Sequence, residues 1–430
     1  MNTLQTAKHI HFVGVGGIGI SAIARMMLAE GRWVSGSDMH ASKITDELVG
    51  LGAKITIDQN IQTIPQETDI IIYSAAIPIA DAPFFEAMQV LAMPSLSYPE
   101  ALSEVTKEKF TIAIAGTHGK TTTTAMIAKI MCDAGLDPTV VVGSLLTDQK
   151  SNFIAGKSKY FVIEADEYRR AFLNYWPNIL AITNIGVDHL DYYKDFEEIK
   201  ETFAELATHV PTDGFLVIPS RDLNLAPVLK KSKAKNVDWS LIPPPARLSL
   251  SGRHNMENAQ VALAVAEVLG IPRESAEASL ANFQGTWRRF EYKGETKEGS
   301  PVYDDYAHNP DKVRAALQGA REKFPDRKLI AVFQPHLYSR TKQLLAQFAE
   351  SFTDADEVYL VPIYAAREPD DPTISAEILA EALRKHHERV FVFPDFVSVE
   401  TYLHTTLTPE CVVIVMGAGS VTELAATLVT

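Results

Sequence analysis

Short runs of consecutive apolar residues recur along the chain, and most are followed by glycine or polar residues and then by a helical pattern. Continuous apolar runs of about four to eight residues are typical of strands that are buried on both faces. The runs cover residues 9–15, 33–36, 68–74, 110–115, 160–164, 179–184, 329–333, 357–362, 389–393 and 412–416. Because helical stretches at 21–30, 121–134 and 256–269 alternate with them, the pattern predicts parallel, doubly wound α/β sheets.

The same pattern predicts more than one domain. The chain has 430 residues, and a single hydrophobic core stops growing near about 250–300 residues. A strand, a glycine turn and a helix follow one another twice, and a cluster of glycine and charge, K-G-E-T-K-E-G, precedes a third group of strands. We therefore predict three α/β domains, at residues 1–107, 108–291 and 292–430.

Composition narrows the class of protein. Hydrophobic residues make up 46% of the chain and charged residues 22%, which is ordinary for a globular protein and excludes bulk disorder. The net charge of −14 argues against a nucleic-acid partner, which usually meets a basic face. The two cysteines, Cys132 and Cys411, are too few for a disulfide framework, which suggests a reducing compartment. Without an apolar stretch of about 18 residues or a leader segment, we expect a cytoplasmic protein with no membrane partner.

The first glycine turn is a candidate diphosphate site. Residues 14–19 read G-V-G-G-I-G directly after a strand and before a helix, which is the order in which a backbone turn approaches a pyrophosphate. Asp38 ends the next strand, where a carboxylate can accept from a ribose or a base. The pattern leaves open a dinucleotide, another diphosphate nucleotide or a purely structural turn. Ser74 and its neighbours follow a later strand at the same kind of edge.

The second glycine turn is the strongest local signal. Residues 115–122 read A-G-T-H-G-K-T-T between a buried strand and an amphipathic helix. A lysine behind such a turn reaches the β- and γ-phosphates, and the next threonine hydroxyl is a Mg²⁺ ligand. Only two residues separate Gly116 from Gly119, so this is a shortened phosphate loop. It predicts a nucleoside triphosphate site, and the alternative is a solvated helix cap.

Two acidic clusters follow strands of the same predicted domain. Glu164-Ala165-Asp166-Glu167 ends one apolar strand, and Asp188-His189 follows the next. Mg²⁺ prefers oxygen ligands, and carboxylates from neighbouring strands provide them. Glu164 is therefore a candidate ligand or else a cap. His189 is a candidate ligand or an ordinary loop residue.

Taken together, the motifs resemble those of the Mur ligases of peptidoglycan synthesis, over essentially the whole chain. Nine segments carry the likeness, in the order of that family. They are F-V-G-V-G-G-I-G-I-S at 12–21, G-T-H-G-K-T-T-T at 116–123, E-A-D-E at 164–167, T-N-I-x-x-D-H at 183–189, H-N-x-x-N-A at 254–259, R-R-F-E at 288–291, D-D-Y-A-H at 304–308, F-Q-P-H-x-Y-S-R-T at 333–341 and M-G-A-G at 416–419. The resemblance implies an N-terminal Rossmann-like domain, a central P-loop-type ATPase domain with a mostly parallel sheet, and a C-terminal Rossmann-like domain.

The resemblance also implies a role for each matched residue. A UDP-sugar would be bound by Gly14, Gly16, Gly17, Ile18, Gly19, Ser21, Asp38, Ser74, Ala75 and His118. ATP would be bound by Gly116, Thr117, Gly119, Lys120, Thr121, Thr122, Asn255, Asn258, Arg289 and Asp305. The amino acid would meet Tyr306, His308, His336 and Arg340. Thr121 and Glu164 would hold Mg²⁺, and His189 would be a second-site metal or substrate ligand. The expected catalytic residues are Lys120, His189, Arg289, His308 and His336, with the choice between His118 and His308 as proton carrier left open.

The reaction that the resemblance implies is ATP-dependent amide formation. L-alanine would be joined to the lactyl carboxylate of UDP-N-acetylmuramate through an acyl phosphate, with ATP and Mg²⁺ as cofactors, in a monomer or homodimer. Three alternatives remain at this point: a related ligase that attaches a peptide to the same sugar, an NAD-dependent oxidoreductase, and a nucleotide-sensing regulator. Asn309, Leu337 and Ser420 depart from common family residues, which concerns recognition of the amino acid more than the type of reaction.

Overall fold

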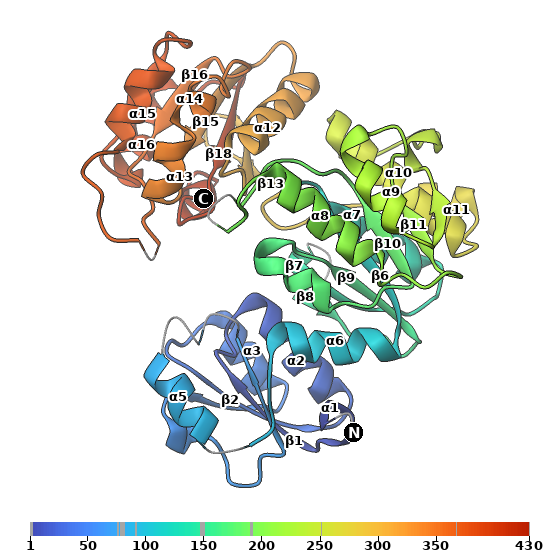
Figure 1. The fold of residues 1–430 in the computed structure, drawn as a ribbon. Helices are drawn as coiled ribbons and strands as arrows, with labels where there is room; N and C mark the ends of the chain where they lie inside the picture. The colour runs from blue at the N-terminus through green and yellow to red at the C-terminus, as the bar shows by residue number, and fades with distance from the viewer. Residues whose placement is uncertain are drawn as a thin grey trace. The chain divides into compact units, whose positions relative to one another are not determined.

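The computed structural model describes residues 3–74, 77, 82–90, 93–146, 151–189, 192–250, 252–366 and 368–429. Three sheets with flanking helices are visible in Figure 1. By its contacts the chain forms two compact units, one of residues 1–249 and 257–284 and one of residues 250–256 and 285–430. The predicted class, three α/β domains with mostly parallel sheets, is confirmed, whereas the boundaries at 107 and 292 stay predictions. Among the described helices, none combines the length and the apolar character needed to cross a membrane.

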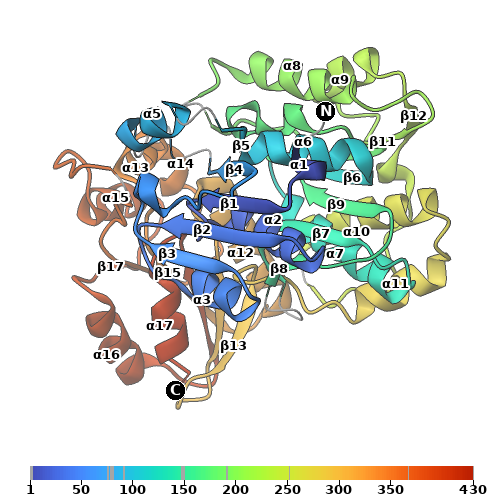
Figure 2. The same cartoon turned by 90° about the horizontal axis from the view of Figure 1, so that it is seen from below.

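The first sheet is entirely parallel, in the order β3-β2-β1-β4-β5, and Figure 2 shows β1, β2 and β3 side by side. Its strands are β1 His9–Val13, β2 Trp33–Asp38, β3 Lys54–Ile57, β4 Ile70–Tyr73 and β5 Ser95–Ser97, and its helices are α1 Thr3–Thr6, α2 Ile18–Ala29, α3 Lys43–Gly50, α5 Ala82–Val90 and α6 Tyr98–Glu108, with a 3-10 turn at Ile61–Thr63. Alternate residues of β4 enter different cores: Ile72 packs in the core of α2, and Ile71 packs with Phe84 of α5. The continuous apolar run was therefore a correct sign of burial on both faces.

The central sheet has the order β12-β11-β10-β6-β9-β7-β8 and is parallel except for β8. Its strands are β6 Phe110–Ala115, β7 Thr139–Leu146, β8 Ser151–Ile154, β9 Tyr160–Glu164, β10 Ile179–Ile182, β11 Phe215–Val217 and β12 Lys235–Val237. Its helices are α7 Lys120–Asp133, α8 Phe196–Ala207, α9 Ala226–Lys231, α10 Arg253–Val268 and α11 Arg273–Ala281, with 3-10 turns at Tyr168–Asn174, Leu223–Leu225 and Trp239–Leu241. Because β6 lies between β9 and β10, the second glycine turn and both acidic clusters leave the sheet at adjacent carboxyl ends.

The third sheet has the order β13-β14-β18-β15-β16-β17, with only β13 antiparallel. Its strands are β13 Glu291–Glu295, β14 Pro301–Asp305, β15 Lys328–Phe333, β16 Glu357–Leu360, β17 Val390–Val392 and β18 Cys411–Met416. Its helices are α12 Pro310–Lys323, α13 Tyr338–Gln343, α14 Leu345–Ala349, α15 Ala376–Leu383, α16 Phe396–Thr406 and α17 Thr422–Thr427. Along β15, Ala331 packs in one core and Val332 in the other, so helices cover both faces.

A buried polar joint connects the first two sheets within their unit. The Asn152 side chain on β8 accepts from Arg25 of α2 (2.8 Å) and donates to the carbonyl of Ile18. Arg25 also donates to Ser21 (3.1 Å) and pairs with Glu47 (2.7 Å). The start of α2, where the first glycine turn ends, is thus fixed against the central sheet.

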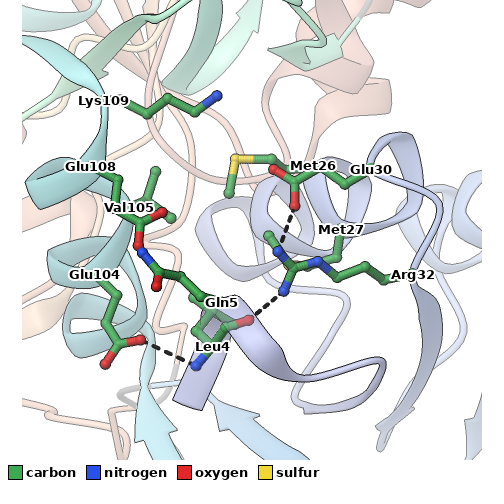
Figure 3. Close-up of a pocket in the computed structure, with 10 residues that line it drawn as sticks. All are labelled: Leu4, Gln5, Met26, Met27, Glu30, Arg32, Glu104, Val105, Glu108 and Lys109. Atoms are coloured by element: carbon green, nitrogen blue, oxygen red, sulfur yellow. Dashed lines mark hydrogen bonds and ion pairs between the residues drawn. The ribbon is translucent and has the colours of Figure 1, made fainter. Parts of the chain in front are cut away.

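A small pocket of about 30 Å³ lies at the opposite end of α2 from that turn (Figure 3). It is lined by Leu4, Gln5, Met26, Met27, Glu30, Arg32, Glu104, Val105, Glu108 and Lys109. The charged groups of the pocket hold α1 in place. Arg32 pairs with Glu30 and donates to the Leu4 carbonyl, and Glu104 accepts from the Leu4 N–H. None of the lining residues is a predicted site residue, so the pocket has no part in the chemistry below.

His11 on β1 makes a pH-dependent contribution to stability. The ring is 1% exposed, its Nδ1 lies 2.9 Å from the Ser35 hydroxyl, and burial lowers its pKa to about 4. Between pH 6.5 and pH 4 this ring is therefore protonated in the unfolded chain and neutral in the folded chain. The free energy of unfolding falls by up to about 3 kcal/mol as the pH drops through this range.

We expect the ring signal of His11 in NMR spectra, assigned by its absence in His11→Asn, to stay constant from pH 8 to pH 5. A midpoint near pH 6.5 would contradict this assignment.

Candidate active site

The first glycine turn leaves the start of α2 open to an anion. Gly14 has φ 73° and, with Val15, donates its N–H to the Ser37 carbonyl, which bends the chain away from β1. Gly17 precedes α2 without a side-chain cap. Gly17 therefore places no side-chain cap on the first N–H groups of this helix, which is the arrangement that a diphosphate site requires. Gly19 packs so closely on the ring of Tyr98 that a Cβ would lie 2.8 Å from it.

Several residues predicted to touch the UDP-sugar have partners within the protein. Asp38 accepts from the N–H groups of Gly16 (2.8 Å) and His40 (3.1 Å). Ser21 is fully buried and its hydroxyl donates to the Ile18 carbonyl. In this conformation both residues shape the turn, and their contact with a nucleotide stays a prediction. Ser74 lies against Gly14, whereas Ala75 is outside the described residues.

Packing and backbone conformation require glycine at two positions of the second glycine turn. Gly116 has φ 136° and Gly119 has φ 84°, and residues with a side chain rarely adopt such backbone angles. A Cβ on Gly116 would lie 2.1 Å from the Thr183 hydroxyl, and one on Gly119 would lie 2.2 Å from Asn258 Oδ1. Gly119 precedes α7 without a side-chain cap. Asn258 is thereby placed beside the loop, and Asn255 lies one turn earlier on α10, also buried.

The loop is held by Thr183 and Asn184, which follow β10. The Thr183 hydroxyl and the Asn184 amide both donate to the His118 carbonyl, and Asn184 Oδ1 accepts from the His118 N–H. Thr117 is buried and exchanges hydrogen bonds with Gly186. Sequence analysis identified the T-N-I motif but assigned no role to its first two residues. Their position directly after a buried strand was the available signal.

Lys120 opens α7 and is held by Glu167. Its Nζ donates to Glu167 Oε2 (2.7 Å) and to the Gly116 carbonyl (2.6 Å). Burial alone lowers the pKa of Lys120, but the negative charges of Glu167, Asp166 and Glu164 raise it above its ordinary value. Lys120 therefore stays cationic. Glu167 is 1% exposed, and its burial raises the pKa of the carboxyl despite the lysine.

Thr121 and Glu164 form a second pair beside this lysine. The Thr121 hydroxyl donates to Glu164 Oε1 (2.9 Å), and Glu164 Oε2 accepts from the Gly143 N–H (2.8 Å). The threonine proton is thus committed to the carboxylate, so its lone pairs are available to a cation. Thr122 follows on the same buried helix turn.

His189 belongs to a different group from Thr121 and Glu164. Asp166, Glu167 and His189 each offer one side-chain atom that could bind a metal ion, and these three atoms lie within 4.8 Å of one another. Glu167 Oε1 lies 4.0 Å from His189 Nε2 and has no hydrogen-bond partner among the described residues. The resemblance implies that Thr121 and Glu164 hold Mg²⁺ and that His189 is a second-site metal or substrate ligand. The structure gives two neighbouring sets of donors, and the second set contains Glu167, which is not among the predicted ligands.

These donors fit Mg²⁺. The ion prefers carboxylate and hydroxyl oxygens, and a buried carboxylate oxygen without a donor is stabilised by a cation. Thr121 and Glu164 are the residues that would hold it, with Glu167 and His189 next to them. Mg²⁺, when bound, supplies charge neutralisation for the phosphates.

The contact between Lys120 and Glu167 predicts tighter nucleotide binding in one variant. In Glu167→Gln the lysine loses its buried counter-charge, so phosphate no longer competes with a carboxylate for it. We expect the Kd of ADP without Mg²⁺ to fall roughly tenfold, measured by calorimetry in chelator. Glu201→Gln removes the same charge from an exposed carboxylate of the same unit, which pairs with Lys231 on the surface, and should change the Kd little. Weaker ADP binding in Glu167→Gln would contradict the competition.

In the second unit, Asp305 ends β14, and Arg289 lies in the turn before β13, the strand that pairs with β14. Asp305 is buried and accepts from the N–H groups of Phe290 (2.7 Å) and Ala307 (2.8 Å). Burial raises its pKa to about 6, although the charge of Arg289 opposes this. The Arg289 guanidinium lies over the ring of Tyr306, 5.4 Å from its centre. The two residues predicted to meet ATP in this part of the chain are therefore neighbours.

The residues predicted to meet the amino acid also lie together. The rings of Tyr306 and His308 are 5.1 Å apart, and those of His308 and His336 are 6.2 Å apart. Arg340 donates to His336 Nδ1 (3.1 Å). His308 Nδ1 donates to the Tyr306 carbonyl (2.7 Å), and burial holds the pKa of His308 well below its usual value. His308 is therefore neutral, with Nε2 able to accept a proton.

Comparison with known proteins decides the family. The Mur ligase family catalytic domain matches residues 9–110, the Mur ligase middle domain matches 114–244, and the Mur ligase glutamate ligase domain matches 288–419. The UDP-N-acetylmuramate–L-alanine ligase of Caldanaerobacter subterraneus is 39% identical, with 98% of this chain and 97% of that protein covered. The chain belongs to the Mur ligase family.

Further relatives agree with this assignment. The UDP-N-acetylmuramate–L-alanine ligase of Lachnospira eligens is 38% identical to this Mur ligase, with 96% of each chain covered. The crystal structure of the UDP-N-acetylmuramate-alanine ligase of Thermotoga maritima superposes with a TM-score of 0.80 at 26% identity, covering 98% of both chains. A murein peptide ligase of Psychrobacter arcticus gives a TM-score of 0.69 at 25% identity, covering 98% of this chain and 100% of that one. The resemblance and the enzyme class predicted from sequence are confirmed, and the oxidoreductase alternative is not favoured.

Two departures of this Mur ligase from common family residues have structural roles. Asn309 caps α12, because its side-chain oxygen accepts from the Lys312 N–H (2.9 Å). Leu337 has φ 70°, and its N–H donates to the Tyr364 carbonyl (3.0 Å). Tyr364 stacks on His336, with ring centres 5.7 Å apart. Sequence analysis did not single out Tyr364, and its position after β16 was the only signal.

Proposed function

We propose that this Mur ligase joins L-alanine to the lactyl carboxylate of UDP-N-acetylmuramate and converts ATP to ADP and phosphate. The observation that carries the proposal is the cationic Lys120 at an open helix start, with the Thr121–Glu164 pair beside it. The relatives named for this reaction cover nearly the whole chain. We also infer that it acts in the cytoplasm, where ATP and nucleotide sugars are available, without nucleic acid or membrane as partner.

In the first step the lactyl carboxylate attacks the γ-phosphorus, and the bond to the β-phosphate oxygen breaks. ADP leaves, and an acyl phosphate forms. Catalysis of such a transfer consists mainly of positioning and of charge stabilisation. Lys120 and the first N–H groups of α7 would stabilise charge on the transferring phosphoryl, and Arg289 would add a second cation. For Lys120 to act, it must exchange Glu167 for phosphate.

In the second step the alanine amine attacks the acyl carbon, a tetrahedral intermediate forms, and phosphate leaves with the C–O bond pair. One proton must be removed from the amine. Neutral His308 suits this task, since its Nδ1 donates to the Tyr306 carbonyl and its Nε2 is the accepting atom. His118 is the other candidate. The two are distinguished by which substitution removes the acidic limb of the pH dependence of kcat, because a general base must be unprotonated to act.

The alanine carboxylate would pair with Arg340, whose planar fork binds both oxygens. Replacing Arg340 by Lys keeps the charge but loses the fork. We expect the KM for L-alanine to rise roughly 10- to 100-fold, while the KM for UDP-N-acetylmuramate stays unchanged in steady-state kinetics. Arg314→Lys, on the exposed side of α12 in the same unit, is the control and should leave both constants as they are. An unchanged KM for L-alanine in Arg340→Lys would remove Arg340 from the site.

The proposed function is tested by phosphate release. ATP and UDP-N-acetylmuramate are supplied with each member of a panel of amino acids, and with a tripeptide that begins with L-alanine. L-alanine should be the best acceptor. A higher rate with the tripeptide would indicate the peptide-attaching alternative. ATP binding without phosphate release under any condition would indicate a regulator, and tight NADH binding unaffected by the UDP-sugar would indicate an oxidoreductase.

A further inference from the structure

The turn that enters the third sheet holds two non-glycine residues in the left-handed region, one on each side of Arg289. Arg288 has φ 55° and Phe290 has φ 49°. Such conformations are unfavourable for residues with a Cβ, and they persist only where surrounding contacts fix them. Arg289 itself is the residue for which the sequence predicts contact with ATP. The strain therefore surrounds a residue with a proposed role in the reaction.

The backbone of this turn is fixed at three points. The Arg288 carbonyl accepts from the Tyr306 N–H (2.7 Å), and the Arg288 N–H donates to Glu291 Oε2 (2.9 Å). The Phe290 N–H donates to Asp305 Oδ2 (2.7 Å). These bonds tie the turn to the end of β14, where Asp305 and Tyr306 lie.

The side chain of Arg288 extends the tie to a second loop. It is 2% exposed, and its Nε donates to both oxygens of Asp304, at 3.1 and 3.2 Å. Its Nη1 donates to the Gly419 carbonyl (3.2 Å), and its Nη2 donates to the Gly417 carbonyl. One guanidinium thus joins the turn, the end of β14 and the glycine loop that follows β18.

This arrangement needs an arginine. A guanidinium carries five N–H donors in a rigid plane, whereas a lysine ammonium is a compact point charge on a flexible stem. A lysine at this position can still neutralise the buried Asp304, but it cannot reach the carboxylate and two separate carbonyls at once. The contacts beyond Asp304 therefore do more than balance a charge.

We propose that Arg288 is a positioning residue. Its guanidinium fixes the turn that contains Arg289 relative to the Gly417–Gly419 loop. The proposal rests on the proposed function only for its kinetic consequence. Arg289 would stabilise charge that develops during phosphoryl transfer, so its placement affects the transition state more than the binding of the first substrate. Loss of the link should then lower kcat and leave the KM for UDP-N-acetylmuramate unchanged.

The test compares Arg288→Lys with Thr422→Val. The Thr422 hydroxyl donates to the same carboxylate, Asp304 Oδ2 (2.5 Å), and among the described residues it forms no side-chain hydrogen bond to Gly417–Gly419. We expect Arg288→Lys to lower kcat about 100-fold, with the KM for UDP-N-acetylmuramate within about twofold of wild type. Thr422→Val should keep kcat within about threefold.

Hydrogen exchange gives a second readout that needs no substrate. Amides of residues 411–421 should exchange faster in Arg288→Lys and at the wild-type rate in Thr422→Val. Unchanged exchange together with unchanged kcat in Arg288→Lys would overturn the proposal, as would equal losses of kcat in both variants. Failure of the proposed function is seen separately, as absence of phosphate release by the wild-type enzyme.

If Arg288→Lys shows no cooperative melting transition, Asp304→Asn decides. It keeps the shape of the side chain that holds the guanidinium but leaves one acceptor oxygen where Nε now has two. The proposal predicts a loss of kcat of about tenfold with an unchanged KM for UDP-N-acetylmuramate. Wild-type kcat in Asp304→Asn would overturn it.

Discussion

Replacing Lys120 by Ala should lower the rate of alanine-dependent phosphate release by about 10³-fold or more. Among the described residues, Lys120 is the only cationic side chain that forms a hydrogen bond to the second glycine turn. It lies at the start of α7. Removing a preorganised cation from a phosphoryl-transfer site typically costs this much. The rate is measured by coupled phosphate release at saturating substrates.

The matched control for this prediction is Lys129→Ala. Lys129 lies on the same helix, is partly exposed and pairs with Asp133 (2.6 Å). It should retain wild-type rates. Binding of UDP-N-acetylmuramate, measured by calorimetry without ATP, should be unchanged in both variants, because its proposed site lies at the first glycine turn. A Lys120→Ala enzyme of normal rate would refute the role assigned to the lysine.

Replacing Glu164 by Gln should have the second largest effect. The carboxylate accepts from the Thr121 hydroxyl with Oε1 and from the Gly143 N–H with Oε2. In the amide of the same shape, the single oxygen can still accept from Gly143, and the NH2 group can donate to the Thr121 oxygen. The charge that attracts Mg²⁺ is lost, however. We expect kcat to fall about 10²- to 10³-fold, and the Mg²⁺ concentration for half-maximal rate to rise at least about tenfold.

A magnesium titration of phosphate release provides the measurement. Glu201→Gln is the control, because Glu201 is an exposed carboxylate of the same unit that pairs with Lys231 on the surface. It should leave the titration unchanged. A Glu164→Gln enzyme with reduced kcat and an unchanged Mg²⁺ requirement would show that Glu164 acts by shaping the loop, and the metal assignment would be withdrawn.

The strands of the fold were predictable from local pattern, and the antiparallel edges were not. β9 is the predicted run without change, and β6 likewise, since both are continuous apolar runs buried on both faces. β8 and β13 carry polar residues and lie at sheet edges, where only one neighbour stabilises the strand. An edge strand has a weak sequence signal because much of its burial is provided by its single partner.

The candidate site divides in the same way. Local motifs were sufficient to propose Lys120, Thr121 and Glu164, because loop spacing and residue type restrict their chemistry. They were insufficient for Glu167, which pairs with a lysine 47 positions away in sequence. They were also insufficient for the hydrogen bond of Asp38. Its carboxylate accepts from the Gly16 N–H, a donor that the motif alone assigns to a phosphate. Such pairings depend on which strands are adjacent, and a linear pattern contains no such information.

By itself the sequence determined that this protein is a chain of α/β domains with two glycine turns, and its motifs resemble those of ligases that use a nucleotide. The domains and the turns follow from residue type and spacing, which act over a few positions along the chain. Only the tertiary structure decided that His189 lies with Glu167 and that one buried guanidinium, Arg288, links two loops 129 positions apart. Contacts of this kind arise because the carboxyl ends of parallel strands converge, wherever in the sequence those strands occur.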